Sequence, residues 1–161
     1  MNRNVNKKEY PRHIARRTAL QAMYGHVMNS AENFEKLLSD VTSLGDSLPE
    51  PVEEFSQELL EAAIERVELA NSVIMKVIEN WELSRINILD RCILYIGIAE
   101  FIDFPDIAPN ITIDEAVELA KEFGSLDSPK FVNGILDAVL RVLIEMKMVE
   151  KPEFRVENEK Q

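Results

Sequence analysis

Cationic side chains gather at the beginning of the chain, where residues 1–17 hold six Lys and Arg against a single acid, a net charge of +5. Three of these cations are Arg12, Arg16 and Arg17, with His13 beside them. In a helix, residues four apart share a face, so Arg12 would lie above Arg16 and His13 above Arg17. A guanidinium can bond a phosphate through two parallel hydrogen bonds and can stack on a base. This spacing favours a helix end that faces nucleic acid.

The remainder of the chain has the opposite charge. It contains 12 Lys and Arg against 28 Asp and Glu, a net charge of −16, so that the whole protein has a net charge of −11. An acidic body repels polyanions everywhere except at its basic end. The distribution of charge is therefore a better guide to the ligand than the net charge. A solvated basic tail without any partner is the other interpretation that charge alone allows.

No arrangement of residues predicts an active site. The two histidines, His13 and His26, are thirteen residues apart, which is not a metal-ligand spacing. No phosphate-binding or dinucleotide-binding glycine loop is found. Asp90 lies in an apolar segment beside Arg91, and an ion pair with a cation of a neighbouring helix explains it better than catalysis does. We therefore expect a protein that is not an enzyme, with no catalytic residue, no metal and no cofactor.

Composition predicts an all-α protein. The chain has 161 residues, enough for a single domain, and its 5 glycines and 7 prolines are too few for a many-stranded β fold. The one cysteine, Cys92, lies in an apolar segment and suits a reducing cytosol. Neither a signal peptide nor an apolar stretch long enough to span a membrane is evident. We expect a cytoplasmic protein that makes no use of a membrane.

Apolar residues recur at helical spacing in several long segments. We expect helices over residues 11–29, 52–81, 86–104, 112–123 and 129–147, and a short amphipathic segment over 34–41. Tyr24 is expected on the inward face of the first helix. The segment over 52–81 is long for one globular helix, so we predict a break near Ala70–Ser72. The segment over 86–104 is apolar nearly all round and predicts a central, buried helix.

Capping residues mark the last two helices. Thr112 and Glu115 have the spacing of a capping box, and Gly124 stands where a glycine commonly ends a helix. Asp127 or Ser128 is expected to cap the helix that follows.

These boundaries give a simple domain organisation. We predict a flexible basic tail over residues 1–10, one helical domain over 11–147 and a frayed tail over 148–161. Residues 42–51, with one glycine and two prolines, are expected to form a flexible loop.

Two segments of the sequence resemble the bacterial NusB family of transcription antitermination factors. They are ARRTALQAMY, at 15–24, and ITIDEAVELAKEFGSLDSPKFVNGILD, at 111–137. The string ILDRCILYIGIAEF between them is similar to the central helix of that family, and the resemblance extends from Arg12 to about Leu143. DSPKFVNGILD is a specific string, whereas ALQAMY alone is a weak one.

The resemblance implies a compact all-helical fold of about seven helices in two halves. It also implies a function without catalysis, in which the protein binds boxA of nascent ribosomal RNA leaders together with the small-subunit ribosomal protein NusE. That complex helps RNA polymerase to pass terminators. Family members often have a denser arginine-rich run than PRHIARR, where Ile14 interrupts the cations. A partner that extends the surface would then be needed for tight binding.

A second wall of the RNA site is expected at the start of the last helix. Lys130, Phe131 and Asn133 lie within one turn there, and single-stranded RNA needs a ring on which an unstacked base can lie. Phe131 as a core residue and Lys130 as an ordinary exposed lysine are the simpler alternatives. The predicted RNA site therefore comprises Arg12, His13, Arg16, Arg17, Lys130, Phe131 and Asn133.

The NusE surface is expected at the end of the central helix, at Glu100, Asp103 and Phe104, because an acidic patch suits a basic ribosomal protein. A homodimer is a further possibility. Two other functions remain open. One is a helical scaffold for protein assembly, and the other is an accessory module for RNA modification. NusB-like domains of the second kind are fused to a cofactor-binding methyltransferase domain, which these 161 residues do not contain.

Overall fold

The structure is a computed structural model, and it describes residues 9–28, 49–79 and 82–150. Within these ranges the chain forms helices only, as expected, and no strand is present. The amphipathic segment over 34–41, most of the loop over 42–51 and the outer parts of both tails lie outside the described residues. Every helix in the described part is too short or too polar to cross a bilayer.

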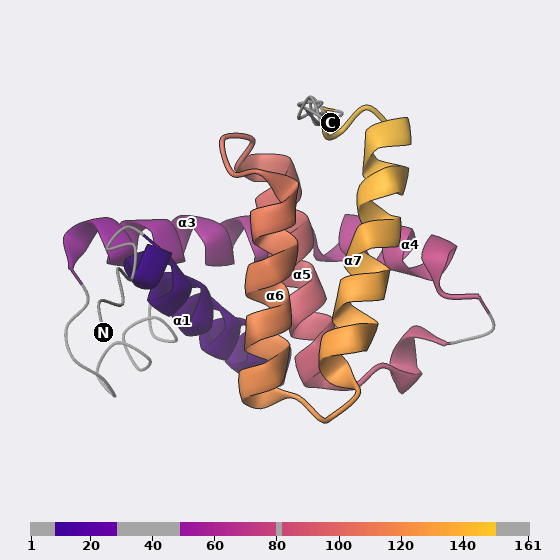
Figure 1. Cartoon of the computed structure of the whole chain (residues 1–161), viewed down its shortest axis with the longest axis horizontal. Helices are drawn as coiled ribbons and strands as arrows, with labels where there is room; N and C mark the ends of the chain where they lie inside the picture. Colours follow the sequence, from indigo (N-terminus) through magenta and orange to yellow (C-terminus); the bar gives the residue numbers. More distant parts are fainter. Residues whose placement is uncertain (1–8, 29–48, 80–81, 151–161) are drawn as a thin grey trace, which may run out of the picture.

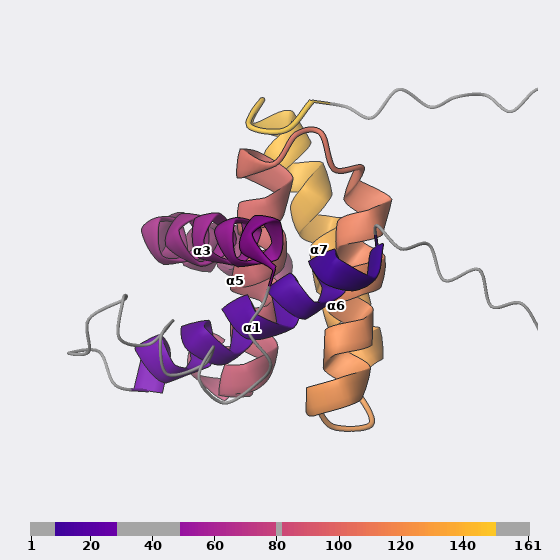
Figure 2. The same ribbon diagram turned by 90° about the vertical axis from the view of Figure 1, so that its left-hand side faces the viewer.

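Six α-helices and one 3-10 turn make up the described fold (Figure 1). They are α1 (Glu9–Met28), α3 (Glu50–Glu65), α4 (Val67–Val77), η1 (Leu83–Arg85), α5 (Ile88–Asp103), α6 (Pro109–Phe123) and α7 (Ser128–Glu145). Helix α5 is central, since it contacts α1, α3, α4, α6 and α7. Figure 2 shows α5 between α3 and the α6–α7 pair, with α1 crossing in front of it. Helices α1 and α3 therefore pack on one side of α5, and the α6–α7 pair packs on the other.

Helix α5 is buried on all sides, as its apolar sequence predicts. Ile93, Leu94 and Ile98 are each 0% exposed, and five other helices contact α5. Burying one such side chain contributes about 1.5–3 kcal/mol to folding. The helix begins at Asn87, whose side-chain Oδ1 accepts a hydrogen bond from the backbone N–H of Leu89 at 2.8 Å.

The break in the long acidic segment falls at Arg66, four residues before the expected position. Arg66 has φ −94° and ψ 4° and separates α3 from α4. Its Nε and Nη2 donate to the two carboxylate oxygens of Asp103, at 3.1 and 2.8 Å. Ser72 instead bonds back to the carbonyl of Leu69 and caps no new helix. A contact with the end of α5 therefore accompanies the break, and the local sequence at Ala70–Ser72 does not produce it.

The expected capping box at the start of α6 is wrong. The helix begins at Pro109, three residues earlier, where the missing N–H of proline costs nothing. The hydroxyl of Thr112 donates to Glu100 at 3.0 Å, and the carboxylate of Glu115 lies against His13. Both side chains are used in contacts between helices.

A tight turn joins α6 to α7. Gly124 ends α6 with φ −90°, so it is not there to supply a left-handed conformation. A Cβ at this position would lie 2.5 Å from Cβ of Ser128, and glycine is needed for that close approach. Asp127 occupies the N-cap position without a side-chain bond, whereas the Ser128 hydroxyl accepts from the Ser125 N–H at 3.0 Å. At the far end of α7, Met148 and Val149 still pack against the core, although we expected fraying from residue 148.

Candidate nucleic-acid interface

Helix α1 packs on α3 and α5 through small side chains. Ala15, Ala19 and Ala22 are fully buried, which lets the helix backbones approach closely. Gln21 and Tyr24 remain on the outer face, and Tyr24 is 41% exposed although its position in the apolar pattern predicted an inward ring.

Arg16 is not on the surface. Its side chain is 3% exposed and pairs with Glu100, which is 1% exposed. Nε of Arg16 donates to Oε2 of Glu100 at 2.9 Å, and Nη2 donates to Oε1 at 2.7 Å. This corrects two expectations, because neither a buried guanidinium nor a buried carboxylate is available to RNA or to a protein partner. Sequence reasoning missed the pair since its members lie 84 residues apart.

His13 and Arg17 lie at the boundary between α1 and α6. Nδ1 of His13 is 2.7 Å from Oε2 of Glu115, and its Nε2 is 3.6 Å from Oε2 of Glu122. Nη1 of Arg17 donates to Oε1 of Glu122 at 2.9 Å. Arg17 is 39% exposed and Glu122 is 36% exposed, so this pair lies in contact with water. Carboxylates of α6 therefore already partner both His13 and Arg17.

Arg12 faces α3. It is exposed, and its guanidinium carbon lies 5.5 Å from the centroid of the Phe55 ring, a cation–π contact that Arg16 also makes at 5.6 Å. Arg12 forms no ion pair with the side chains that the structure describes. The Phe55 ring meets Phe104 edge-on at 5.2 Å. The structure thus separates Arg12 from His13 and Arg17, which face α6.

The expected partner residues are largely occupied within the protein. Asp103 is bonded to Arg66, with its side chain 31% exposed, and half-buried Phe104 packs on Phe55. Only part of each side chain remains available for another molecule.

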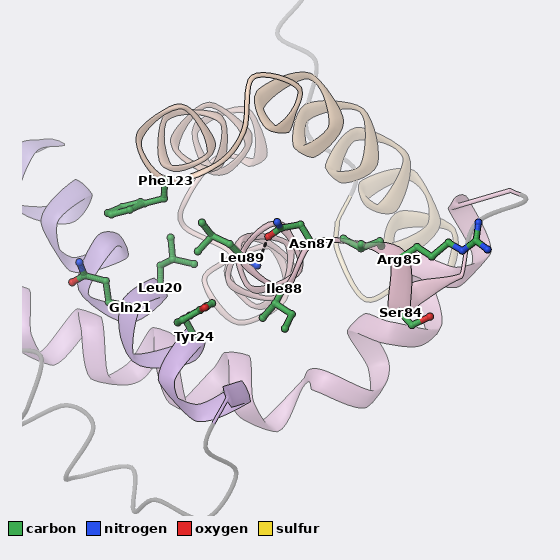
Figure 3. Close-up of a pocket in the computed structure, with 10 residues that line it drawn as sticks. Leu20, Gln21, Tyr24, Ser84, Arg85, Asn87, Ile88, Leu89 and Phe123 are labelled. Atoms are coloured by element: carbon green, nitrogen blue, oxygen red, sulfur yellow. Dashed lines mark hydrogen bonds between the residues drawn. The ribbon is translucent and has the colours of Figure 1, made fainter.

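A groove of about 750 Å³ opens beside α1, at the end of the bundle where α5 begins and α6 ends. In Figure 3 the α1 side chains lie on one side of it and Arg85 on the other, with the start of α5 between them. It is lined by Leu20, Gln21, Tyr24, Ser84, Arg85, Ile86, Asn87, Ile88, Leu89 and Phe123. An aromatic ring, an amide and a guanidinium surround an apolar floor, a combination that can hold a nucleobase.

Sequence reasoning did not find this groove. Its walls come from three separate parts of the chain. A signal was nevertheless present, because Arg17, Gln21 and Tyr24 follow one another at spacings of four and three residues and so share a face of α1.

The other expected RNA residues lie at the start of α7, at the same end of the bundle (Figure 1). Lys130 and Asn133 are exposed, whereas Phe131 is half-buried and packs against the core. Gly134 follows them on the exposed face, and no heavy atom lies within 4 Å of the place where its Cβ would be. Lys130 and Asn133 are thus available to a ligand, and Phe131 presents only part of its ring.

Asp90 and Cys92, both in α5, are buried and show no sign of catalytic activation. Asp90 is 8% exposed, and no cation among the described residues pairs with it, so the expected ion pair is wrong. It lies instead in the first turn of α5, where the helix dipole stabilises a carboxylate.

Burial raises the pKa of the Cys92 thiol to about 12, which keeps it protonated and unreactive at neutral pH. In the described part of the chain, no cluster of three His, Cys, Asp or Glu side chains could hold a metal ion.

Comparison with known proteins agrees with this arrangement of helices. A model of the NusB family matches residues 13–141. The transcription antitermination protein NusB of Carboxydothermus hydrogenoformans is 36% identical over 131 residues, which cover 80% of this chain and 91% of that protein.

Solved structures show the same fold. The NusB structure from T. maritima superimposes with a TM-score of 0.74 at 30% identity, covering 81% of this chain and 90% of that one. A crystal structure of the antitermination factors NusB and NusE in complex with dsRNA has a TM-score of 0.75 at 26% identity, covering 83% and 98% of the two chains. This chain belongs to the NusB family.

Proposed function

We propose that the protein is an RNA-binding transcription antitermination factor that acts in the cytoplasm and performs no catalysis. Its ligand is the single-stranded boxA segment of ribosomal RNA leaders, bound together with the ribosomal protein NusE, and the complex helps RNA polymerase to pass terminators. Curated relatives named as antitermination proteins and a structural neighbour holding NusB, NusE and RNA support this proposal.

The observation that supports RNA as the ligand is a polar stripe on α1 that leads into an aromatic groove. His13, Arg17, Gln21 and Tyr24 follow one another at helical spacing, and the last two line the groove with Phe123. A cation at one end of this stripe suits a phosphate, and the exposed Tyr24 ring suits an unstacked base.

The start of α7 extends the same surface in this proposal. Lys130 and Asn133 are exposed near the end of α6, and Lys130 supplies a further cation. Arg12 would contact RNA from the α3 side of α1. Arg16 has an indirect role, since its bond to Glu100 holds α1 on the central helix. Four neutralised phosphates would give a salt slope of roughly −3 on single strands. That modest dependence is consistent with a need for a protein partner.

For the partner we propose the end of α5, where Asp103 and Phe104 keep part of their surface exposed. Glu100 is not part of this proposed partner surface, because its side chain is buried. Replacing Asp103 with asparagine should weaken calorimetric binding of NusE, whereas Asp114→Asn, at an exposed position on α6, should leave it unchanged.

A titration with labelled boxA RNA and a scrambled RNA of equal length, with and without NusE, tests the function. Tighter binding of boxA in the presence of NusE is expected. Lys130→Ala should weaken it and flatten the salt slope by about 0.7, as expected for one lost phosphate contact. Lys76→Ala, an exposed lysine of α4, serves as the control. Equal binding of both RNAs under every condition would contradict the proposal and favour the helical scaffold.

A further inference from the structure

The polar side chains of α1 that lead towards the groove are already held by carboxylates of α6. Arg17 donates to Glu122 at 2.9 Å, and His13 lies 2.7 Å from Glu115 and 3.6 Å from Glu122. A carboxylate offers Arg17 the same kind of oxygen acceptor as an RNA phosphate does. RNA that follows the stripe on α1 must therefore compete with Glu122 for this guanidinium.

The Arg17–Glu122 pair is not needed to hold α1 in place. Helix α1 is already anchored by the buried Arg16–Glu100 pair and by its fully buried alanines. Arg17 and Glu122 are each more than one third exposed, and ion pairs of this kind contribute little to stability. The pair should therefore affect the affinity of a ligand at this surface more than it affects the stability of the protein.

The Arg17–Glu122 pair lies next to residues that line the groove. Arg17 lies four residues before Gln21 and seven before Tyr24, and Glu122 directly precedes Phe123. Gln21, Tyr24 and Phe123 all line the groove. A base in the groove would bring its own phosphate close to the Arg17–Glu122 pair.

We propose that Glu122 is an internal competitor of RNA, which keeps Arg17 out of phosphate contact and so lowers the RNA affinity of the free protein. This inference rests on the proposed RNA-binding function. It assigns to α6 an autoinhibitory contact, which a bound partner or a correctly placed RNA phosphate must displace.

Glu122→Gln tests this, with Glu118→Gln as its matched control. Glu118 lies one turn earlier on the same helix and is exposed, and its carboxylate pairs with Lys121 at 3.1 Å instead of with α1. Both substitutions remove one negative charge, but only the first releases Arg17. The probes are a labelled 12-nucleotide uridine RNA and boxA RNA, titrated into the full chain at several salt concentrations.

Glu122→Gln is expected to raise the affinity for both RNAs about two- to fivefold, because an exposed ion pair of this strength is removed. It should also steepen the salt slope by about 0.7, the change expected for one added phosphate contact. Glu118→Gln should do neither beyond a small general charge effect. In an Arg17→Ala background the gain from Glu122→Gln should fall to the small charge effect of Glu118→Gln, as a double-mutant cycle requires for coupled residues.

Equal gains from the two substitutions, or a full gain from Glu122→Gln in the absence of Arg17, would overturn the inference. The proposed function is judged separately, by whether the wild-type chain prefers boxA to the scrambled RNA. If the wild type binds no RNA measurably, binding by Glu122→Gln but not by Glu118→Gln still supports the competitor, and binding by neither variant rejects it.

Discussion

The guanidinium of Arg16 is bonded through two nitrogens to the carboxylate of Glu100, and both side chains are almost completely buried. Glu100 also accepts a hydrogen bond from Thr112, so one carboxylate on α5 links α1 and α6. The pair fixes α1 on the central helix, and with it the orientation of the exposed stripe that leads to the groove.

Removing one partner of this pair should be strongly destabilising. Glu100→Leu would leave a buried guanidinium without its carboxylate, and a loss of about 3–5 kcal/mol in the free energy of unfolding is expected. The double variant Arg16→Met with Glu100→Leu should recover most of that loss, because neither charge of the pair then remains buried without its partner. Urea unfolding followed by circular dichroism measures both. A single variant as stable as the wild type would show that the charges are not buried as the structure has them.

Gly124, which ends α6, and Gly134, which lies inside α7, should respond in opposite ways to alanine. Gly134 lies inside α7 on its exposed face with open space around it, so Gly134→Ala should stabilise the protein by about 1 kcal/mol. Gly124→Ala would place a Cβ 2.5 Å from Ser128 and should destabilise it by about 1–3 kcal/mol. Thermal unfolding of the two variants checks this. A lower melting temperature for Gly134→Ala would mean that its surroundings are not open.

The buried thiol of Cys92 should make the protein less stable in alkali. Burial raises its pKa from 9.0 to about 12, so the folded state keeps a proton that the unfolded state loses. Stability from this group is therefore complete below pH 9 and is lost as the pH rises towards 12. Between pH 8 and 10.5, the free energy of unfolding should fall less steeply in Cys92→Ala than in the wild type.

Alkylation gives a second measurement of the same thiol. Iodoacetamide at pH 8.5 should modify Cys92 slowly in the native protein and rapidly in urea, because the thiolate is the reactive form. Equal rates in the two conditions would contradict the burial of this side chain.

The elements that the sequence predicted well are those with a strong periodic signal of their own. Helix α5 was expected to be buried because its segment is apolar nearly all round, and α7 lies within two residues of its expected bounds. The break at Arg66 was misplaced because Asp103, 37 residues away, supplies its partner. The pairing of Thr112 with Glu100 on α5 and of Glu115 with His13 on α1 likewise depends on contacts between helices, which local capping rules do not include.

The candidate site was predictable only in part for the same reason. The cluster of cations on α1 is visible in the sequence, but which of them is buried depends on Glu100, and which are held depends on Glu122. The groove depends on three separate segments meeting at the start of α5. Residue type and spacing thus indicated the kind of ligand, and the contacts between helices decide which of these side chains are exposed and unpaired among the described residues.

Tyr24 offers the most direct test of the groove as a base-binding site. The residue is 41% exposed, so replacing it should change stability little, whereas an aromatic ring that stacks on a base contributes about 1–3 kcal/mol to binding. Tyr24→Leu should therefore weaken boxA binding by about five- to a hundredfold, and Tyr24→Phe, which keeps the ring, should retain most of the affinity. Met75→Leu, an exposed position on α4, controls for a general effect of changing surface hydrophobicity. Fluorescence anisotropy at fixed salt gives the affinities of these three variants and of the wild type. If leucine and phenylalanine at position 24 bind RNA equally well, the ring does not stack on a base, and RNA does not enter the groove beside α1.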